Sequence, residues 1–261
     1  MTDAPAPRRG PLEAGRLVLV AVQFLTRIPV PDPGFREDDL RRATAAFPLV
    51  GALVGGVGAL VAAVLWPVVT PVVAVLLLTA AEIAVTGAFH EDGLADTFDG
   101  LWGGWTVQRR IEIMRDSRLG TYGATALLLA LGLRVAALAG IALEQGLGGV
   151  VVATLCGHVL GRAAILVVVR LLPPADDGGS GARVADPLGA VGLAVAGATT
   201  ALVLGVGLGT QAWVPVLVAG PVVAGAAATW RAKLGGVTGD TLGATEQLVH
   251  LATLVSVAAL P

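Results

Sequence analysis

The sequence predicts an all-α fold: a polytopic membrane helix bundle with about seven transmembrane helices and an N-terminal interfacial helix. Hydrophobic residues make up 55% of the 261-residue chain and charged residues only 14%, a balance that soluble globular domains rarely reach. Aromatic residues account for 4%, whereas 36 residues are glycine, as is typical of transmembrane helices that pack closely through small side chains. Because the stretches between apolar runs are short, residues 1–261 are expected to form a single integral-membrane domain.

Seven apolar stretches are each long enough to cross the hydrocarbon core of a bilayer. They occupy residues 45–66, 68–89, 121–142, 148–172, 187–208, 211–229 and 244–260. Ahead of them, residues 1–11 are expected to be disordered. Residues 12–28 hold an apolar run with Arg16 and Arg27 near its ends, which is too short to span comfortably and predicts an interfacial helix. The whole segment 12–42 is expected to lie in the interface or the cytoplasm.

Basic residues divide the loops into two sets. Arginine or lysine is present before the first span, between spans two and three, beside the loop after span four, and between spans six and seven. The alternate loops, which begin at Trp66, at Glu144 and near Thr210, contain neither. By the positive-inside rule, the basic set faces the cytoplasm. The sequence therefore predicts a cytoplasmic N-terminus, an outside C-terminus, and a cytoplasmic catalytic loop over residues 90–120.

The run His90–Gly100 places four carboxylates at the end of the second apolar stretch. On an α-helix, Asp92, Asp96 and Asp99 share one narrow face, whereas Glu91 points elsewhere. Like charges at this spacing repel each other, and a divalent cation such as Mg²⁺, which prefers carboxylate oxygens, would compensate them. The run therefore predicts a metal site formed by the three aspartates. The alternative is an acidic, solvated turn beside the membrane.

Arginines follow in the same loop, within residues 109–123. Arg115 and Arg118 are predicted to face the aspartates, and a guanidinium group binds phosphate oxygens in a fork. This arrangement predicts a site for a phosphate-bearing substrate next to the metal site. The alternative is that both are ordinary basic residues of a cytoplasmic loop.

A second candidate for anion binding is the stretch Gly235–Gly243, which is rich in glycine and hydroxyl groups and includes Thr238 and Asp240. Such a stretch brings backbone N–H groups close to an anion, although it is not a Walker A sequence. The alternative is a flexible turn between helices. Glu246 and His250 follow one helical turn apart, as either a coupled pair or a pair of interfacial polar residues.

Glu82, Arg134 and Arg162 lie deep inside predicted spans. Glu82 lies in the second span, where a lone carboxylate is costly unless it is paired, and Arg134 and Arg162 are its available partners. We expect a buried structural pair. The alternative is an ion path through a small-solute transporter, although the two halves of the chain show no evident inverted repeat. His158, one turn from Arg162, is expected to pack inside the bundle.

Five motifs resemble those of the adenosylcobinamide-GDP ribazoletransferase family, also called the cobalamin 5′-phosphate synthases. They are Phe24–Pro31, Phe47–Gly51, His90–Gly100, Ile113–Gly123 and Gly235–Asp240. The motifs are in the family's order, extend over nearly the whole chain and are separated by no large insertion. Agreement at five ordered positions makes the resemblance specific.

The resemblance implies a Mg²⁺-dependent transferase of cobalamin biosynthesis in the inner membrane. Such an enzyme transfers the adenosylcobinamide-phosphate group of adenosylcobinamide-GDP to α-ribazole or its 5′-phosphate, forming adenosylcobalamin or its 5′-phosphate and releasing GMP. Its catalytic residues would be Asp92, Asp96 and Asp99, which hold the metal, and Glu91. Either Glu91 or Asp99 would take the proton from the ribose hydroxyl. Its substrate-binding residues would be Arg115, Arg118, Asp116, His90, Thr238 and Asp240.

The expected partners are these small molecules and membrane lipid, without nucleic acid. A homo-oligomer, or association with other cobamide-assembly enzymes, is left open. The acidic run also resembles, distantly, the signature of the CDP-alcohol phosphotransferases of lipid synthesis, from which it differs in spacing and in lacking an Ala-Arg pair. That family is the nearest alternative. A structural scaffold would leave the aspartates without a role.

Overall fold

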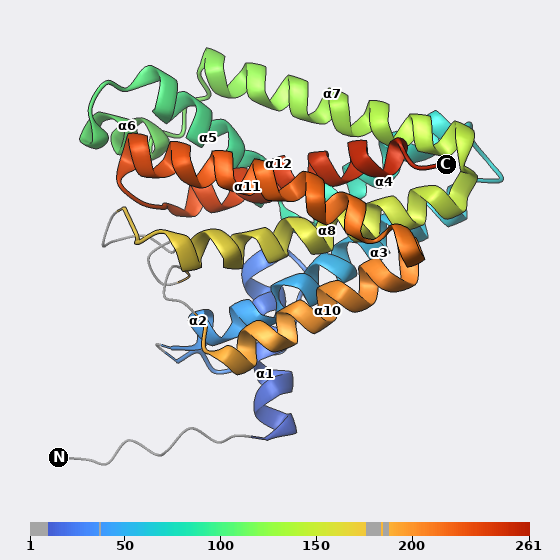
Figure 1. The fold of residues 1–261 in the computed structure, drawn as a ribbon, viewed down its shortest axis with the longest axis horizontal. Helices are drawn as coiled ribbons and strands as arrows, with labels where there is room; N and C mark the ends of the chain where they lie inside the picture. The colour runs from blue at the N-terminus through green and yellow to red at the C-terminus, as the bar shows by residue number, and fades with distance from the viewer. Residues whose placement is uncertain (1–9, 37, 176–183, 185–187) are drawn as a thin grey trace.

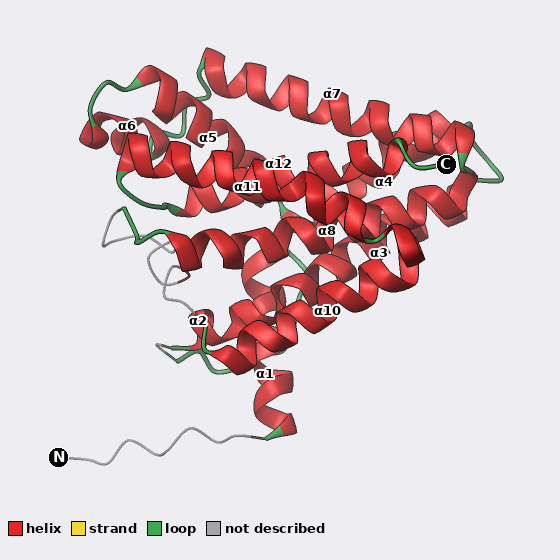
Figure 2. Ribbon diagram, viewed as in Figure 1, coloured by secondary structure: helices red, strands yellow, loops and turns green. Residues whose placement is uncertain are grey.

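The structure, a computed structural model, describes residues 10–36, 38–175, 184 and 188–261. Throughout these residues the chain is almost entirely helical and contains no β-strand (Figure 2). A short parallel bridge joins Pro174 to Val237. The predicted all-α fold is therefore confirmed. The disorder predicted for residues 1–11 falls almost wholly outside the described residues, the first of which is Gly10.

The long helices run roughly along the axis of one bundle, with α8 at its centre in contact with α3, α7, α10 and α12 (Figure 1). In chain order the elements are α1 (Pro11–Leu25), α2 (Asp39–Ala43), η1 (Thr44–Ala46), α3 (Phe47–Leu65), α4 (Pro71–Thr86), α5 (Phe89–Gly103), α6 (Val107–Met114), α7 (Thr121–Glu144), α8 (Gly146–Leu171), α10 (Ala190–Leu208), η2 (Gly209–Gln211), α11 (Trp213–Leu234) and α12 (Gly239–Ala258). One end of the bundle carries the C-terminus and the turns α3–α4 and α7–α8. The opposite end carries α6, the last turns of α8 and α11, and the first turns of α7 and α12.

The chain is a multi-pass membrane protein. Within the described residues, five helical segments are long and apolar enough to cross a membrane: Asp39–Leu65, Thr121–Glu144, Gly146–Leu171, Ala190–Gln211 and Trp213–Leu234. Helices α4 and α5 meet the same criterion only as a bent pair. The last predicted span, residues 244–260, falls in α12, which is not among the five. The predicted count of seven spans is therefore not confirmed.

A sharp break separates α4 from α5, where the sequence predicts an apolar span running to residue 89. Gly87 and Ala88 both adopt left-handed backbone conformations, with φ of 65° and 59°, and the two helices meet at 84°. Gly87 ends α4 because its N–H returns to the carbonyls of Ile83 and Ala84, as at many helix C-termini. For Ala88 the left-handed conformation costs about 1–2 kcal/mol. The length of an apolar stretch shows whether it could span a membrane but not whether the chain turns within it. The sequence-based prediction therefore missed the break at Gly87.

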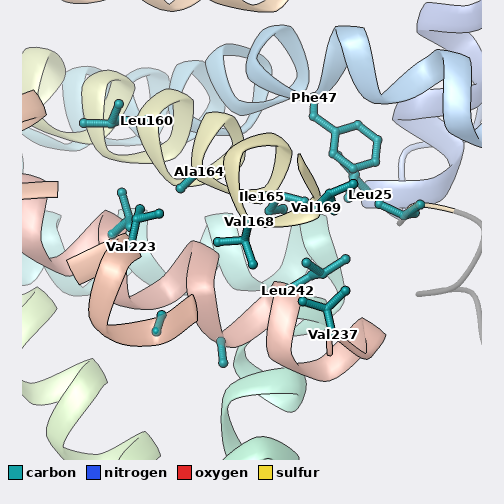
Figure 3. Packing of buried hydrophobic residues seen from close by; sticks show 14 of the residues in the cluster. Leu25, Phe47, Leu160, Ala164, Ile165, Val168, Val169, Val223, Val237 and Leu242 are labelled. Carbon is teal, nitrogen blue, oxygen red and sulfur yellow. The ribbon is translucent and has the colours of Figure 1, made fainter. Parts of the chain in front are cut away.

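The apolar core is built around α8. Ile165 and Val168 of α8 are almost fully buried among Phe47 of α3, Leu25 of α1 and Leu242 of α12 (Figure 3). The core therefore joins the N-terminal helix to the last one. Helix α12 also packs against the acidic helix α5. The core therefore positions the helix against which α5 packs.

Helix α1 confirms the helix predicted within residues 12–28, although it ends at Leu25. Its inner face is buried, and α1 packs against α2 and α3. Arg16 of α1 forms ion pairs with Glu13 and with the buried Asp39 of α2. These contacts fix α1 to the bundle. Its placement in the membrane interface stays a prediction.

Candidate active site

The acidic run forms α5, as its spacing predicts. The three aspartates lie on this one helix but differ in environment: Asp92 is exposed, Asp96 is half-buried and Asp99 is buried. Helix α5 packs against α12 on one side and against α6 and α7 on others. The break at Gly87 sets this helix at a steep angle to α4, so that its polar face meets the loop that leads into α7.

A cleft of about 460 Å³ lies between α5 and that loop. Its charged lining comes from Glu91, Asp92 and Asp96 of α5 and from Arg115 and Asp116 beyond α6. The remaining lining residues are Ala88, Ala95, Met114, Ser117, Leu119 and Leu127. The cleft thus brings together five of the residues predicted to form the site. The wall formed by α5 carries carboxylates, and the opposite wall carries the guanidinium group of Arg115 beside the carboxylate of Asp116.

A larger groove of about 610 Å³ lies between α8, α10 and α11. Among the residues that the structure describes, its lining is almost wholly apolar, with Arg170 as the one ionisable residue. It therefore lacks the groups that phosphoryl transfer needs. The smaller cleft beside α5 is the candidate active site.

Asp240 joins the aspartates of α5 through the close contact between α5 and α12. A Cβ atom on Gly93 would lie only 3.0 Å from the carbonyl oxygen of Asp240 and 3.4 Å from the Cα of Gly243, so glycine permits this approach. The charges of Asp92, Asp240 and Asp99 all act on the half-buried carboxylate of Asp96. Four carboxylates are therefore gathered here, a set that repels itself.

This donor set fits Mg²⁺. Carboxylate oxygens are the protein ligands that Mg²⁺ prefers, and its sites are commonly shared with substrate phosphates. Asp92 and Asp96 line the cleft beside the residues that could contact a phosphate. A divalent cation at this position would offset the mutual repulsion of the acidic groups.

Asp99 has a structural role that the sequence did not reveal. Its Oδ2 accepts the N–H of Gly120 at 2.7 Å and its Oδ1 accepts the N–H of Gly123 at 2.9 Å. These donors belong to the N-terminus of α7, where unpaired N–H groups and the helix dipole favour an anion. Asp99 thus ties α5 to α7, and its role as a metal ligand stays a prediction.

The two arginines predicted to face the aspartates differ. Arg115 lines the cleft. Arg118 is exposed and binds Asp116 through Nε at 3.0 Å and Nη2 at 2.5 Å, and it is not among the residues that line the cleft. Hydrogen bonds from this guanidinium group lower the pKa of Asp116 to about 2, so Asp116 stays ionised even in mildly acidic solution.

Two further predicted substrate-binding residues lie outside the cleft. His90 is buried, with its Nδ1 4.0 Å from Oε2 of Glu246; its predicted orientation away from the aspartates places it in the bundle. Thr238 caps α12. Its hydroxyl accepts a hydrogen bond from the N–H of Thr241 at 3.2 Å, and the hydroxyl of Thr241 accepts one from the N–H of Thr238 at 2.8 Å. A substrate contact for either residue stays a prediction.

A buried polar network fills the bundle behind the cleft. The predicted structural pair is confirmed: Arg134 lies 2.6 Å from Glu82, and both are buried. Arg162 pairs instead with Glu246 at 2.7 Å. Glu246 and His250 are fully buried, and so are not interfacial. His158 also packs inside, as predicted.

The sequence did not reveal that Glu91 belongs to this network as well as to the cleft. Its Oε1 lies 3.3 Å from Arg134 and accepts the side-chain N–H of Gln247 at 3.2 Å. The one available signal was that Glu91 points away from the face shared by the aspartates. Gln247 carries no charge and was not singled out.

Three members of the network, His158, Glu246 and His250, are close enough to suggest a metal site, with ligand atoms within 4.8 Å of one another. However, Nη1 of Arg162 lies 2.7 Å from Oε1 of Glu246 and 3.0 Å from Nδ1 of His158. A guanidinium group therefore already supplies the positive charge at this position. We assign no metal to this group.

Comparison with known proteins identifies relatives over nearly the full chain. The family model described as cobalamin-5-phosphate synthase matches residues 17–258. A curated adenosylcobinamide-GDP ribazoletransferase of Leptothrix cholodnii is 43% identical over 252 residues, which cover 92% of this chain and 94% of the relative. Relatives of the same name from Sinorhizobium medicae and Shewanella piezotolerans are 44% and 40% identical, over 91% and 90% of this chain and 94% and 92% of their own lengths. No solved structure matches the chain.

Proposed function

Because the chain belongs to the cobalamin-5-phosphate synthase family, we propose that it is an adenosylcobinamide-GDP ribazoletransferase acting on α-ribazole or its 5′-phosphate. In this reaction a ribose hydroxyl of the acceptor attacks the phosphorus that carries adenosylcobinamide. A bond forms between that phosphorus and the hydroxyl oxygen, the phosphorus–oxygen bond to GMP breaks, and the hydroxyl proton is released. The products are adenosylcobalamin, or its 5′-phosphate, and GMP.

The observation that best supports this reaction at the cleft is its pairing of opposite charges. Asp92 and Asp96 lie on one wall and Arg115 on the other, within about 460 Å³. Phosphoryl transfer depends mainly on positioning and on neutralising negative charge. Arg115 would bind a pyrophosphate oxygen, because a guanidinium group matches phosphate geometry.

Asp92 and Asp96, with Asp240 beside them, are the residues that would hold Mg²⁺. Bound there, the ion would neutralise the pyrophosphate and the charge that develops on the departing GMP. Asp99 would act mainly by fixing the start of α7, since both of its oxygens accept backbone N–H groups there. This arrangement keeps the loop with Arg115 close to the acidic helix.

The protein would lie in the inner membrane, with its active site facing the cytoplasm. The end of the bundle that carries α6 also carries the exposed Arg109, Arg170 and Arg231 (Figure 1), and positive charge marks cytoplasmic ends. The C-terminus lies at the opposite end. A reporter that is active only outside the cytoplasm, fused after Pro261, should therefore be active; an inactive reporter in a well-expressed fusion would contradict this orientation.

The assay that tests the proposed function uses the purified protein in detergent with adenosylcobinamide-GDP, α-ribazole and Mg²⁺. GMP and adenosylcobalamin should appear in equal amounts, and neither should form without the acceptor. Release of CMP from CDP-diacylglycerol and an alcohol, with no GMP from adenosylcobinamide-GDP, would instead favour a lipid phosphotransferase. Uptake of a solute into vesicles without nucleotide release would favour a transporter.

A further inference from the structure

A single guanidinium group bridges the two sides of the α4–α5 break. Nη2 of Arg134 in α7 lies 2.6 Å from Oε2 of Glu82 in α4, and Nη1 lies 3.3 Å from Oε1 of Glu91 in α5. The side chain of Arg134 is 1% exposed. Because a guanidinium group is planar and donates in fixed directions, contact with both carboxylates restricts how α5 can turn relative to α4.

Glu82 provides a fixed anchor for this bridge. Its Oε1 accepts the hydroxyl of Thr154 in α8 at 2.5 Å. Helix α3 leaves room for the carboxylate through Gly58, where a Cβ atom would lie only 2.1 Å from that oxygen. Thr154 of α8 therefore holds Glu82, α3 leaves space for it, and Arg134 connects the fixed Glu82 to Glu91.

Glu91 stands between the network and the cleft. Its Oε1 is held by Arg134 and by Gln247 at 3.2 Å, whereas its Oε2 is buried without a hydrogen-bond partner among the described residues. Glu91 is also one of the residues that line the cleft. A buried carboxylate oxygen left without a donor is unfavourable, so an O–H group that reaches Oε2 from the cleft would complete it. Because Oε2 itself is buried, the wall of the cleft has to yield slightly at Glu91 for this contact to form.

We propose that Oε2 of Glu91 accepts a hydrogen bond from a ribose hydroxyl of the acceptor nucleoside, and that Arg134 is the positioning residue that holds Glu91 for this contact. The inference rests on the proposed function, since it concerns the acceptor of that reaction. Arg134 touches no substrate. It acts through Glu91, with Glu82 as its anchor and Gln247 as the second support.

The test is a double-mutant cycle read on binding of α-ribazole, by calorimetry with the folded protein in detergent and by KM in the GMP-release assay. Glu91→Gln and Arg134→Lys should each weaken α-ribazole binding by about tenfold or more, as loss of a hydrogen bond to a charged group does. The KM for adenosylcobinamide-GDP should stay within about twofold of wild type. In the double variant the effects should not multiply, because both act on one contact.

Arg162→Lys is the matched control, because Arg162 is equally buried but pairs with Glu246 rather than Glu91. Arg162 reaches Glu91 through Glu246 and Gln247 rather than directly, so Arg162→Lys should weaken α-ribazole binding clearly less than Arg134→Lys does. If Arg134→Lys does not fold, Gln247→Leu provides the second variant, since it removes the other donor to Glu91.

Two results would overturn the inference: α-ribazole binding within about twofold of wild type in Glu91→Gln, or effects of Glu91→Gln and Arg134→Lys that multiply fully in the double variant. A wild-type protein that releases no GMP would instead refute the proposed function. Because wild-type turnover is measured in the same assay, the two failures are distinguishable.

Discussion

Asp99 binds the backbone of Gly120, with 2.7 Å between Oδ2 and the amide nitrogen. This contact joins the end of the acidic helix α5 to the residue before α7. The loop between them carries Arg115, which lines the cleft. One aspartate of the motif therefore shapes the site by fixing the wall that faces the other two.

Asp99→Ala should lower the free energy of unfolding by about 1–3 kcal/mol, because one buried and one half-buried N–H group lose their acceptor. Asp99→Asn, which keeps one acceptor oxygen, should lose less. Denaturant unfolding in mixed micelles measures both. Asp38→Asn is the control, since Asp38 is 77% exposed and lies 3.9 Å from Arg41, and it should change stability by less than about 0.5 kcal/mol.

The same Asp99→Asn variant distinguishes two roles for Asp99: capping the N-terminus of α7 and binding the metal. A cap predicts that the Mg²⁺ concentration for half-maximal activity stays near the wild-type value. A rise as large as that in Asp92→Asn would support the metal role predicted from the sequence. Activity titrated against Mg²⁺ decides between them.

Gly93→Ala should reduce GMP release by more than its effect on folding explains. Its methyl group would lie 3.0 Å from the carbonyl oxygen of Asp240, so α5 and α12 would have to separate and the acidic groups would move apart. Gly103→Ala, on the same helix, would place its methyl group 3.4 Å from Ile113 and meet no other described residue, so it should retain turnover. Equal activity in the two folded variants would show that close packing of α5 against α12 is not needed to position the acidic groups.

Arg162→Met should destabilise the protein by about 3–5 kcal/mol, because it leaves the carboxylate of Glu246 buried without its main partner. The double variant Arg162→Met/Glu246→Met should recover most of that loss, since two apolar side chains replace two buried charges. Unfolding free energies in mixed micelles measure the cycle. A double variant as unstable as the single one would show that the pair contributes more than mutual neutralisation.

Much of this architecture follows from pattern in the sequence. The apolar stretches predict the helices, and the spacing of Asp92 and Asp96 predicts their shared helix. A lone Glu82 predicts a buried pair with one of two available arginines, of which the structure selects Arg134. Each of these depends on a local period or on the cost of an unpaired buried charge. Such signals can be recognised in the sequence without knowledge of the fold.

Two local turns and one contact between distant segments were not predictable in the same way. The break at Gly87 depends on two left-handed residues, one of which is an alanine, and apolar composition does not register it. Pairing Arg118 with Asp116, rather than with the aspartates of α5, is decided by a turn. The bridge from Arg134 to Glu91 depends on the angle between α4 and α5, and the periodicity of the sequence does not predict that angle.

The central claim is that Asp92 and Asp96 in the cleft support the transfer reaction, and turnover of their asparagine variants tests it most directly. GMP release from adenosylcobinamide-GDP and α-ribazole should fall by about a hundredfold or more in Asp92→Asn and in Asp96→Asn, with unfolding free energies near wild type. Glu112→Gln, an exposed change on α6 outside the cleft, should retain full activity. Wild-type turnover in both aspartate variants would contradict the account.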